Sequence, residues 1–89
     1  MRLKDKTAIV TGAGKGIGAA IARRLAQEGC AVAVNYARDE AAAHQVVQDI
    51  EQAGGKAVAV QADVGDPAGM PALFDAAEAA FGPVDLLVN

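Results

Sequence analysis

Four short apolar runs alternate along the chain with three longer amphipathic stretches. The first run, Thr7 to Thr11, is rich in β-branched residues and stops at a cluster of glycines. A run of this kind is typical of a strand buried on both faces of a parallel sheet. Further runs of strand character occupy residues 31–36, 56–61 and 84–88. We therefore predict four strands at these positions.

The spacing of apolar residues after the first run predicts a helix over residues 16–28. Ile17, Ile21 and Leu25 recur every four residues and define one apolar side, which we expect to face the sheet. Gly29 follows at the position where helices commonly end in a left-handed residue.

The second helix is predicted to begin after Asp39, which is a suitable N-cap, and to end at the glycine pair 54–55. The apolar residues between these limits recur at helical spacing. The expected inward stripe consists of Ala43, Val46, Val47, Ile50 and Ala53.

The third helix has a more ambiguous start. Asp66 and Pro67 have the residue types of an N-cap and a first helical residue. Pro71 complicates this prediction, because an interior proline lacks the amide hydrogen and clashes with the carbonyl group four residues earlier. Either the helix begins at Pro71 or its first turn is distorted. The expected inward face consists of Leu73, Phe74, Ala77 and Phe81.

The alternating order predicts an α/β fold, a Rossmann-type doubly wound parallel sheet with right-handed crossovers and helices on both faces. In the usual strand order the first strand is central, the second and third lie on one side, and the fourth starts the other side. The fourth strand would then be an edge, although Leu86, Leu87 and Val88 resemble an interior strand. We therefore expect residues 1–89 to be the N-terminal part of a single, larger three-layer domain, cut short after its fourth strand.

Composition and charge exclude several classes of protein. The net charge is −3, with no cluster of lysine or arginine, so nucleic-acid and membrane-surface binding lose their electrostatic basis. The N-terminal apolar run is too short for a signal sequence or a membrane span, and we expect a cytoplasmic protein. Cys30 is the only cysteine and His44 the only histidine, which excludes an internal disulfide and a zinc cluster. We interpret Cys30 as a small buried hydrophobe and His44 as a solvated residue.

The strongest functional signal is the segment Thr11 to Gly18, which contains four glycines between a strand and a helix. Glycine lets backbone amides approach a pyrophosphate closely, and the helix N-terminus adds about half a positive charge. We expect the amide hydrogens of this segment to converge on a dinucleotide diphosphate. A P-loop is excluded, because Lys15 is followed by Gly16 and not by a serine or threonine that would hold magnesium.

The end of the second strand bears on the choice of cofactor. A site that prefers NAD places an acidic side chain there to accept hydrogen bonds from the ribose hydroxyls. This chain has Asn35, Tyr36, Ala37 and Arg38 instead. Arg38 can pair with a 2′-phosphate, and Lys15 could approach the same group, which favours NADP over NAD. The alternative is that Arg38 is a solvated loop residue and Asp39 only a helix cap.

Asp63 and Val64 follow the third strand, at the edge where the ligands of open parallel sheets bind. Asp63 could accept a hydrogen bond from the exocyclic amine of adenine while Val64 packs on the ring. The alternative is an ordinary loop aspartate.

Together, the pattern Thr11-Gly12-x-x-x-Gly16-x-Gly18, the Asp63-Val64 pair and the ending Leu87-Val88-Asn89 resemble the short-chain dehydrogenase/reductase family. The resemblance implies an NAD(P)-dependent oxidoreductase that forms a homotetramer or dimer, with Asn89 beginning the family's Asn-Asn-Ala-Gly segment. Residues 35–38 look most like the 3-oxoacyl-(acyl-carrier-protein) reductases and the related glucose dehydrogenases. The expected cofactor-binding residues are Gly12, Gly14, Lys15, Gly16, Ile17, Gly18, Tyr36, Arg38, Asp63, Val64 and Asn89.

The family's catalytic groups are absent from residues 1–89. Its serine and its Tyr-x-x-x-Lys pair lie later in the family's chains, and this sequence has no serine. Tyr36 is the only tyrosine, and Glu40 stands where the lysine would have to be. No phenol of lowered pKa is therefore available to protonate a carbonyl oxygen. We expect this segment to supply cofactor binding only, in an enzyme that reduces a carbonyl or oxidises an alcohol.

Two interpretations from other classes stay open. One is a stand-alone module that binds NADP or a partner without turnover. The other is a methyltransferase that uses S-adenosylmethionine, which shares the strand, glycine loop and helix. A methyltransferase would profit from an acidic residue at the end of the second strand and gains nothing from Arg38.

Overall fold

The computed structural model describes residues 3–89 and consists of strands and helices in strict alternation. Each predicted element is present; the strands over residues 31–36 and 56–61 have the predicted bounds, and the other elements differ from theirs by one or two residues. The strands are β1 (Thr7–Val10), β2 (Ala31–Tyr36), β3 (Lys56–Gln61) and β4 (Leu86–Val88). The helices are α1 (Gly16–Gln27), α2 (Glu40–Gln52) and α3 (Gly69–Phe81).

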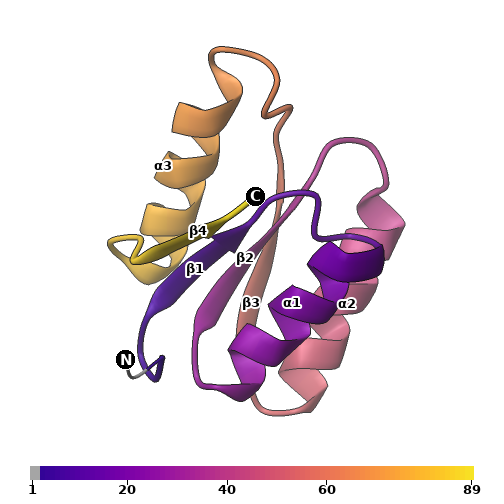
Figure 1. Cartoon of the computed structure of the whole chain (residues 1–89), viewed down its shortest axis with the longest axis vertical. Helices are drawn as coiled ribbons and strands as arrows, with labels where there is room; N and C mark the ends of the chain where they lie inside the picture. The colour runs from indigo at the N-terminus through magenta and orange to yellow at the C-terminus, as the bar shows by residue number, and fades with distance from the viewer. Residues whose placement is uncertain (1–2) are drawn as a thin grey trace.

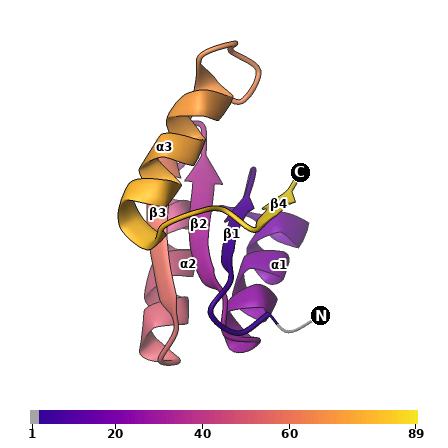
Figure 2. The same cartoon turned by 90° about the vertical axis from the view of Figure 1, so that its left-hand side faces the viewer.

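All strand pairs are parallel, and the strand order is β3-β2-β1-β4. Helices α1 and α2 cover one face of the sheet and α3 covers the other (Figure 1; the sheet is turned by 90° in Figure 2). The predicted doubly wound α/β fold is therefore confirmed. Because the strands are parallel, the connections that follow β1, β2 and β3 all lie at the same end of the sheet.

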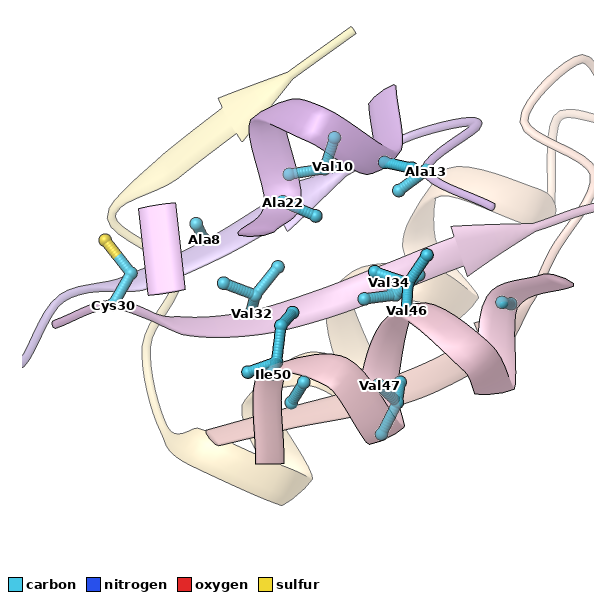
Figure 3. Packing of buried hydrophobic residues seen from close by; sticks show 13 residues of the cluster. Ala8, Val10, Ala13, Ala22, Cys30, Val32, Val34, Val46, Val47 and Ile50 are labelled. Atoms are coloured by element: carbon cyan, nitrogen blue, oxygen red, sulfur yellow. The ribbon is translucent and has the colours of Figure 1, made fainter. Parts of the chain in front are cut away.

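Each face of the sheet has its own hydrophobic core. On the α1 and α2 side, Val32 and Val34 of β2 pack with Val46 and Ile50 of α2 (Figure 3). On the α3 side, Ile9 and Ala33 pack with Leu73 and Ala77. The alternation along β2 places neighbouring residues in different cores, so that the strand is buried on both faces as expected.

The inward face of α1 differs from the predicted one. Ile17 is 81% exposed, whereas the small residues Ala19 and Ala22 are buried against the sheet. Ile21 and Leu25 lie at the margin of the core and are half-buried. The prediction that Ile17 faces the sheet was wrong, because α1 lies close to the strands and only alanine side chains fit between them.

In α2, Ala43, Val46, Val47 and Ile50 are buried as predicted. Ala53 was expected to continue this stripe but is the exposed C-cap residue, since the helix ends at Gln52. Asp39 is the N-cap, and its side chain accepts a hydrogen bond from the amide of Ala42.

The start of α3 also differs from the prediction. Asp66 and Pro67 precede the helix, which begins at Gly69. The Asp66 side chain accepts from the amide of Ala68 at 2.8 Å, so it closes a tight turn before the helix and does not cap it. Pro71 lies in the first helical turn, where the missing amide hydrogen would have had no intrahelical partner.

Strand β4 is an edge strand that pairs only with β1 within the described residues. Its entry is held by Asp85, whose carboxylate accepts from the amide of Thr7 at 2.9 Å while its own amide donates to the Thr7 carbonyl oxygen at 2.9 Å. Leu87 is 42% exposed on this edge. Over residues 3–89, no helix has the length and apolarity required to span a bilayer.

Candidate functional site

The glycine loop between β1 and α1 contains two residues that need the left-handed region. Gly12 has φ +60° and Gly16 has φ +56°, and a Cβ at either position would meet nothing within 4 Å. Replacing either glycine would therefore cause backbone strain and no steric clash, because residues with a side chain disfavour positive φ. The loop can turn sharply after β1 and present its backbone at the start of α1.

The amides of this loop fall into two groups. Those of Thr11, Gly12 and Ala13 point inward, donating respectively to the Val88 carbonyl oxygen, the Asn35 Oδ1 atom and the Asn35 carbonyl oxygen at 2.9, 3.2 and 2.9 Å. The amides of residues 14–18 have no hydrogen-bond partner within residues 3–89. The row of amides that could bind an anion is therefore shorter than expected, five residues at the N-terminus of α1.

The end of β2 brings Lys15 and the acidic cap of α2 together. Lys15 Nζ lies 3.0 Å from Asp39 Oδ2, and both side chains are largely exposed. Two hydrogen bonds lower the pKa of Asp39: the one from the Ala42 amide has the larger effect, and the one from Lys15 the smaller. Arg38 is exposed and has no carboxylate within ion-pair distance among residues 3–89. Of the two cations predicted to bind a 2′-phosphate, Lys15 therefore has a carboxylate partner, and Arg38 has none within residues 3–89.

Tyr36 ends β2 half-buried, and its hydroxyl donates to Glu40 Oε2 at 3.1 Å. Slight desolvation of the phenol, together with this hydrogen bond and the charge of Glu40, raises the pKa of Tyr36. A raised pKa is the opposite of what a phenolic proton donor needs near neutral pH.

The loop after β3 is tightly wound. Asp63 is exposed, and its Oδ1 atom accepts from the amide of Gly65 at 2.9 Å, while Val64 is 41% exposed. Gly69, at the start of α3, packs directly against this loop, since a Cβ there would overlap the Asp63 carbonyl oxygen. The close approach of α3 therefore fixes where Asp63 and Val64 stand.

At the end of β4, Asn89 lies beside the glycine loop. The Thr11 hydroxyl is 3.3 Å from the Val88 carbonyl oxygen and 3.1 Å from Asn89 Oδ1. The predicted residues from all four strand ends are therefore at the same edge of the sheet (Figure 1). His44 is exposed on α2 and lies 3.7 Å from Glu40 Oε2, the oxygen that also accepts from the Tyr36 hydroxyl.

A comparison with protein-family models matches residues 6–89 to the short chain dehydrogenase family. The chain belongs to the short-chain dehydrogenase family. The methyltransferase interpretation is therefore wrong.

Relatives and solved structures of this family are close in sequence and shape. Over 88 residues the chain is 56% identical to an uncharacterised oxidoreductase of Methylorubrum extorquens, covering 99% of this chain and 36% of that protein. It is 55% identical over 87 residues to 3β-hydroxysteroid dehydrogenase 1 of Eggerthella lenta, with coverages of 98% and 33%. A short chain dehydrogenase from Burkholderia cenocepacia, crystallised in complex with NADP, is 47% identical with a TM-score of 0.93, covering 100% of this chain and 36% of that one. The chain spans about a third of the length of the curated relatives it matches.

The part played by Asn35 in this member of the family was not predicted from the sequence. Asn35 is 2% exposed, and its side chain holds the start of the glycine loop through the amide of Gly12. A signal was available, because Asn35 interrupts the apolar run of a strand predicted to be buried on both faces, and a buried polar group requires hydrogen-bond partners.

Two hollows of the short-chain dehydrogenase fold lie at the other end of the sheet. Their volumes are about 350 and 480 Å³, and both are lined by Gly29, Gly54 and Gly55, which follow α1 and α2. None of the predicted cofactor-binding residues lines them. The candidate site in residues 3–89 is therefore an open edge formed by backbone amides and loop side chains.

Proposed function

We propose that residues 1–89 are the cofactor-binding N-terminal part of an NADP-dependent oxidoreductase. The observation that carries the proposal is the row of five amides at residues 14–18, which have no hydrogen-bond partner in the described part of the chain and lie at the N-terminus of α1, at the carboxyl edge of a parallel sheet. Aligned peptide dipoles and free N–H groups at a helix N-terminus favour a diphosphate. Open space above Gly12 and Gly16 lets a ligand approach the backbone there.

We assign each of the other predicted residues to one part of the cofactor. Arg38 and Lys15 would bind the 2′-phosphate, and Tyr36, the last residue of β2, would contact the cofactor beside them. Asp63 and Val64 would contact adenine, the carboxylate through Oδ2, because Oδ1 already accepts from Gly65. Gly14, Ile17 and Gly18 would surround the pyrophosphate, with the exposed Ile17 side chain and Asn89 on the side away from adenine.

When bound, the nicotinamide would exchange a hydride with the carbon of a carbonyl or hydroxyl substrate, and the resemblance of residues 35–38 to the 3-oxoacyl-(acyl-carrier-protein) reductases suggests a 3-oxoacyl thioester as one such substrate. The residues of this chain bind and orient the cofactor. The proton for the substrate oxygen would come from residues beyond Asn89, because Tyr36 is bonded to Glu40 and has a raised pKa.

Calorimetric titration of the intact protein with NADP and NAD tests the proposal. We expect NADP to bind more tightly than NAD and Arg38→Asp to weaken NADP binding by about 10- to 100-fold, the range of a lost charge-assisted hydrogen bond together with new repulsion. Arg24→Asp, the same charge change near the C-terminus of α1, is the matched control and should leave both affinities unchanged.

Failure of the wild-type protein to bind either dinucleotide would refute the proposal. Binding with an unchanged preference in Arg38→Asp would show that Arg38 does not read the 2′-phosphate. Tight NADP binding without reduction of any 3-oxoacyl thioester, ketone or aldehyde by the intact protein would favour the non-catalytic binding module instead.

A further inference from the structure

Asn35 is the polar side chain of β2 and is almost completely buried. Only 2% of its surface is exposed, although valine and alanine fill the other buried positions of this strand. Burying an amide is costly unless all of its hydrogen-bonding groups are satisfied. Its partners therefore indicate what the residue does.

The side chain of Asn35 bridges two segments that do not pair with each other. On one side, Oδ1 accepts from the amide of Gly12 at 3.2 Å. On the other side, Nδ2 donates to the carbonyl oxygens of Val60 and Ala62, each at 3.2 Å. Only this orientation of the amide satisfies all three contacts, because Val60 and Ala62 offer carbonyl acceptors and Gly12 offers an amide donor.

The residues that Asn35 bridges lie next to the two segments expected to bind the pyrophosphate and the adenine. Gly12 is the first glycine of the loop whose free amides lie at residues 14–18, and Ala62 directly precedes Asp63 and Val64. Strand β1 ends at Val10, and beyond this point the glycine loop is held against β2 by the hydrogen bond from the Ala13 amide to the Asn35 carbonyl oxygen at 2.9 Å. The Asn35 side chain adds a second link to this loop and extends it across β2 to the end of β3.

We propose that Asn35 is a positioning residue that fixes the distance between the pyrophosphate subsite of the glycine loop and the adenine subsite of the loop after β3. The inference rests on the proposed dinucleotide site. A ligand that spans both subsites gains from their being held at the correct separation, because no free energy is spent on arranging them. A ligand that occupies one subsite gains nothing from this spacing.

The test compares a spanning ligand with a fragment. ADP-ribose carries adenine and diphosphate, and its diphosphate does not titrate near neutral pH, whereas adenosine occupies the adenine subsite alone. In Asn35→Leu, which is similar in size but has no hydrogen-bonding groups, we expect ADP-ribose affinity to fall by about 5- to 30-fold, as for one or two lost buried hydrogen bonds. Adenosine affinity, followed by NMR titration, should change by less than about twofold.

Val32→Ala is the matched control for loss of stability. Val32 is fully buried in the same strand and pairs with Ala8 and Ala57, inside the sheet and away from the strand ends. Measured at a temperature where circular dichroism shows each protein folded, this control should keep the wild-type affinity for both ligands. If Asn35→Leu and Val32→Ala weaken both ligands equally, or if Asn35→Leu weakens neither, the proposal is wrong.

Asn35→Asp gives a second readout that a general packing role would not produce. A protonated carboxyl can accept from Gly12 and donate to a β3 carbonyl oxygen, as the amide does, whereas the ionised form faces two carbonyl oxygens without a donor. We expect ADP-ribose affinity of this variant to recover towards the wild-type value as the pH falls from 8 to 5, while the wild type stays constant. A flat profile would overturn the proposal, and a wild type that binds neither ADP-ribose nor NADP would refute the dinucleotide site itself.

Discussion

The carbonyl oxygen of Gly12 lies where a side chain on Gly18 would begin: a Cβ built at Gly18 would be 2.5 Å from it. The first turn of α1 is thereby in direct contact with the end of β1. This contact holds the N-terminus of the helix, together with the amides of residues 14–18, at the carboxyl edge of the sheet.

Gly18→Ala should destabilise the protein and displace the glycine loop. The added methyl group overlaps backbone atoms that have no rotamer to move into, so we expect a loss of ~1–3 kcal/mol in the free energy of unfolding. Gly14→Ala is the control, since a Cβ there would make ordinary contacts of 3.5 Å or more with α2. Urea unfolding measures both, and equal stabilities would show that the close approach does not constrain the loop.

Gly69→Ala should act on the loop after β3. A Cβ at this position would overlap the Asp63 carbonyl oxygen, so α3 or the loop must move. We expect a stability loss of ~1–3 kcal/mol or more and weaker binding of adenosine. In Gly65→Ala the new methyl group would meet the Asp63 side chain at 3.2 Å, and a side chain can move aside. This variant of the same loop should change both quantities less, and the opposite ranking would contradict the interpretation.

Asp39→Asn should tighten NADP binding. Asparagine keeps an acceptor for the Ala42 amide but removes the carboxylate that partners Lys15. Near the proposed 2′-phosphate, loss of one negative charge should raise NADP affinity by about 2- to 5-fold, with little change for NAD. Asp49→Asn is the matched control, because it removes the α2 carboxylate that pairs with Arg23 on the outer side of the helix pair. If the two variants behave alike in calorimetry, Lys15 takes no part in cofactor choice.

The same two carboxylates predict the acid side of the stability profile. Hydrogen bonds from Ala42 and Lys15 lower the pKa of Asp39, and those from Gln45 and Arg23 lower that of Asp49. A group whose pKa is depressed on folding contributes stability above its unfolded value of about 3.9, and this stability disappears as the pH falls through the folded value. Denaturant midpoints of the wild type should therefore fall between about pH 5 and pH 2. The double variant Asp39→Asn, Asp49→Asn should show a shallower decline, and parallel curves would be evidence against this origin.

The order of elements was predictable because each strand and helix has its own local pattern in the sequence. Apolar runs such as residues 31–36 are too short for helices, and Gly29 and Gly54 both adopt positive φ directly after a helix, as predicted for Gly29. The strand order followed from the usual order of strands in this fold. The inward face of α1 was not predictable in the same way, because the period-four spacing of Ile17, Ile21 and Leu25 also suits a helix whose alanines approach the sheet.

Much of the candidate site was also predictable from the sequence. The glycine loop and the loops after β2 and β3 had to meet at one edge, since parallel strands end together. Which amides of the glycine loop stay free was not predictable, because it depends on Asn35, 23 residues from Gly12. Nor did the sequence indicate that Lys15 lies against Asp39, or that Gly69 presses on Asp63.

By itself, the sequence determined the alternation of strands and helices, the parallel sheet and the place of the glycine loop, because hydrophobic period and glycine conformation act over a few neighbouring residues. Only the tertiary structure decided how deeply each helix packs, which loop amides are consumed within the protein, and how far apart the two loops stand. These properties arise from contacts between residues distant along the chain, and such contacts leave no periodic pattern in the sequence.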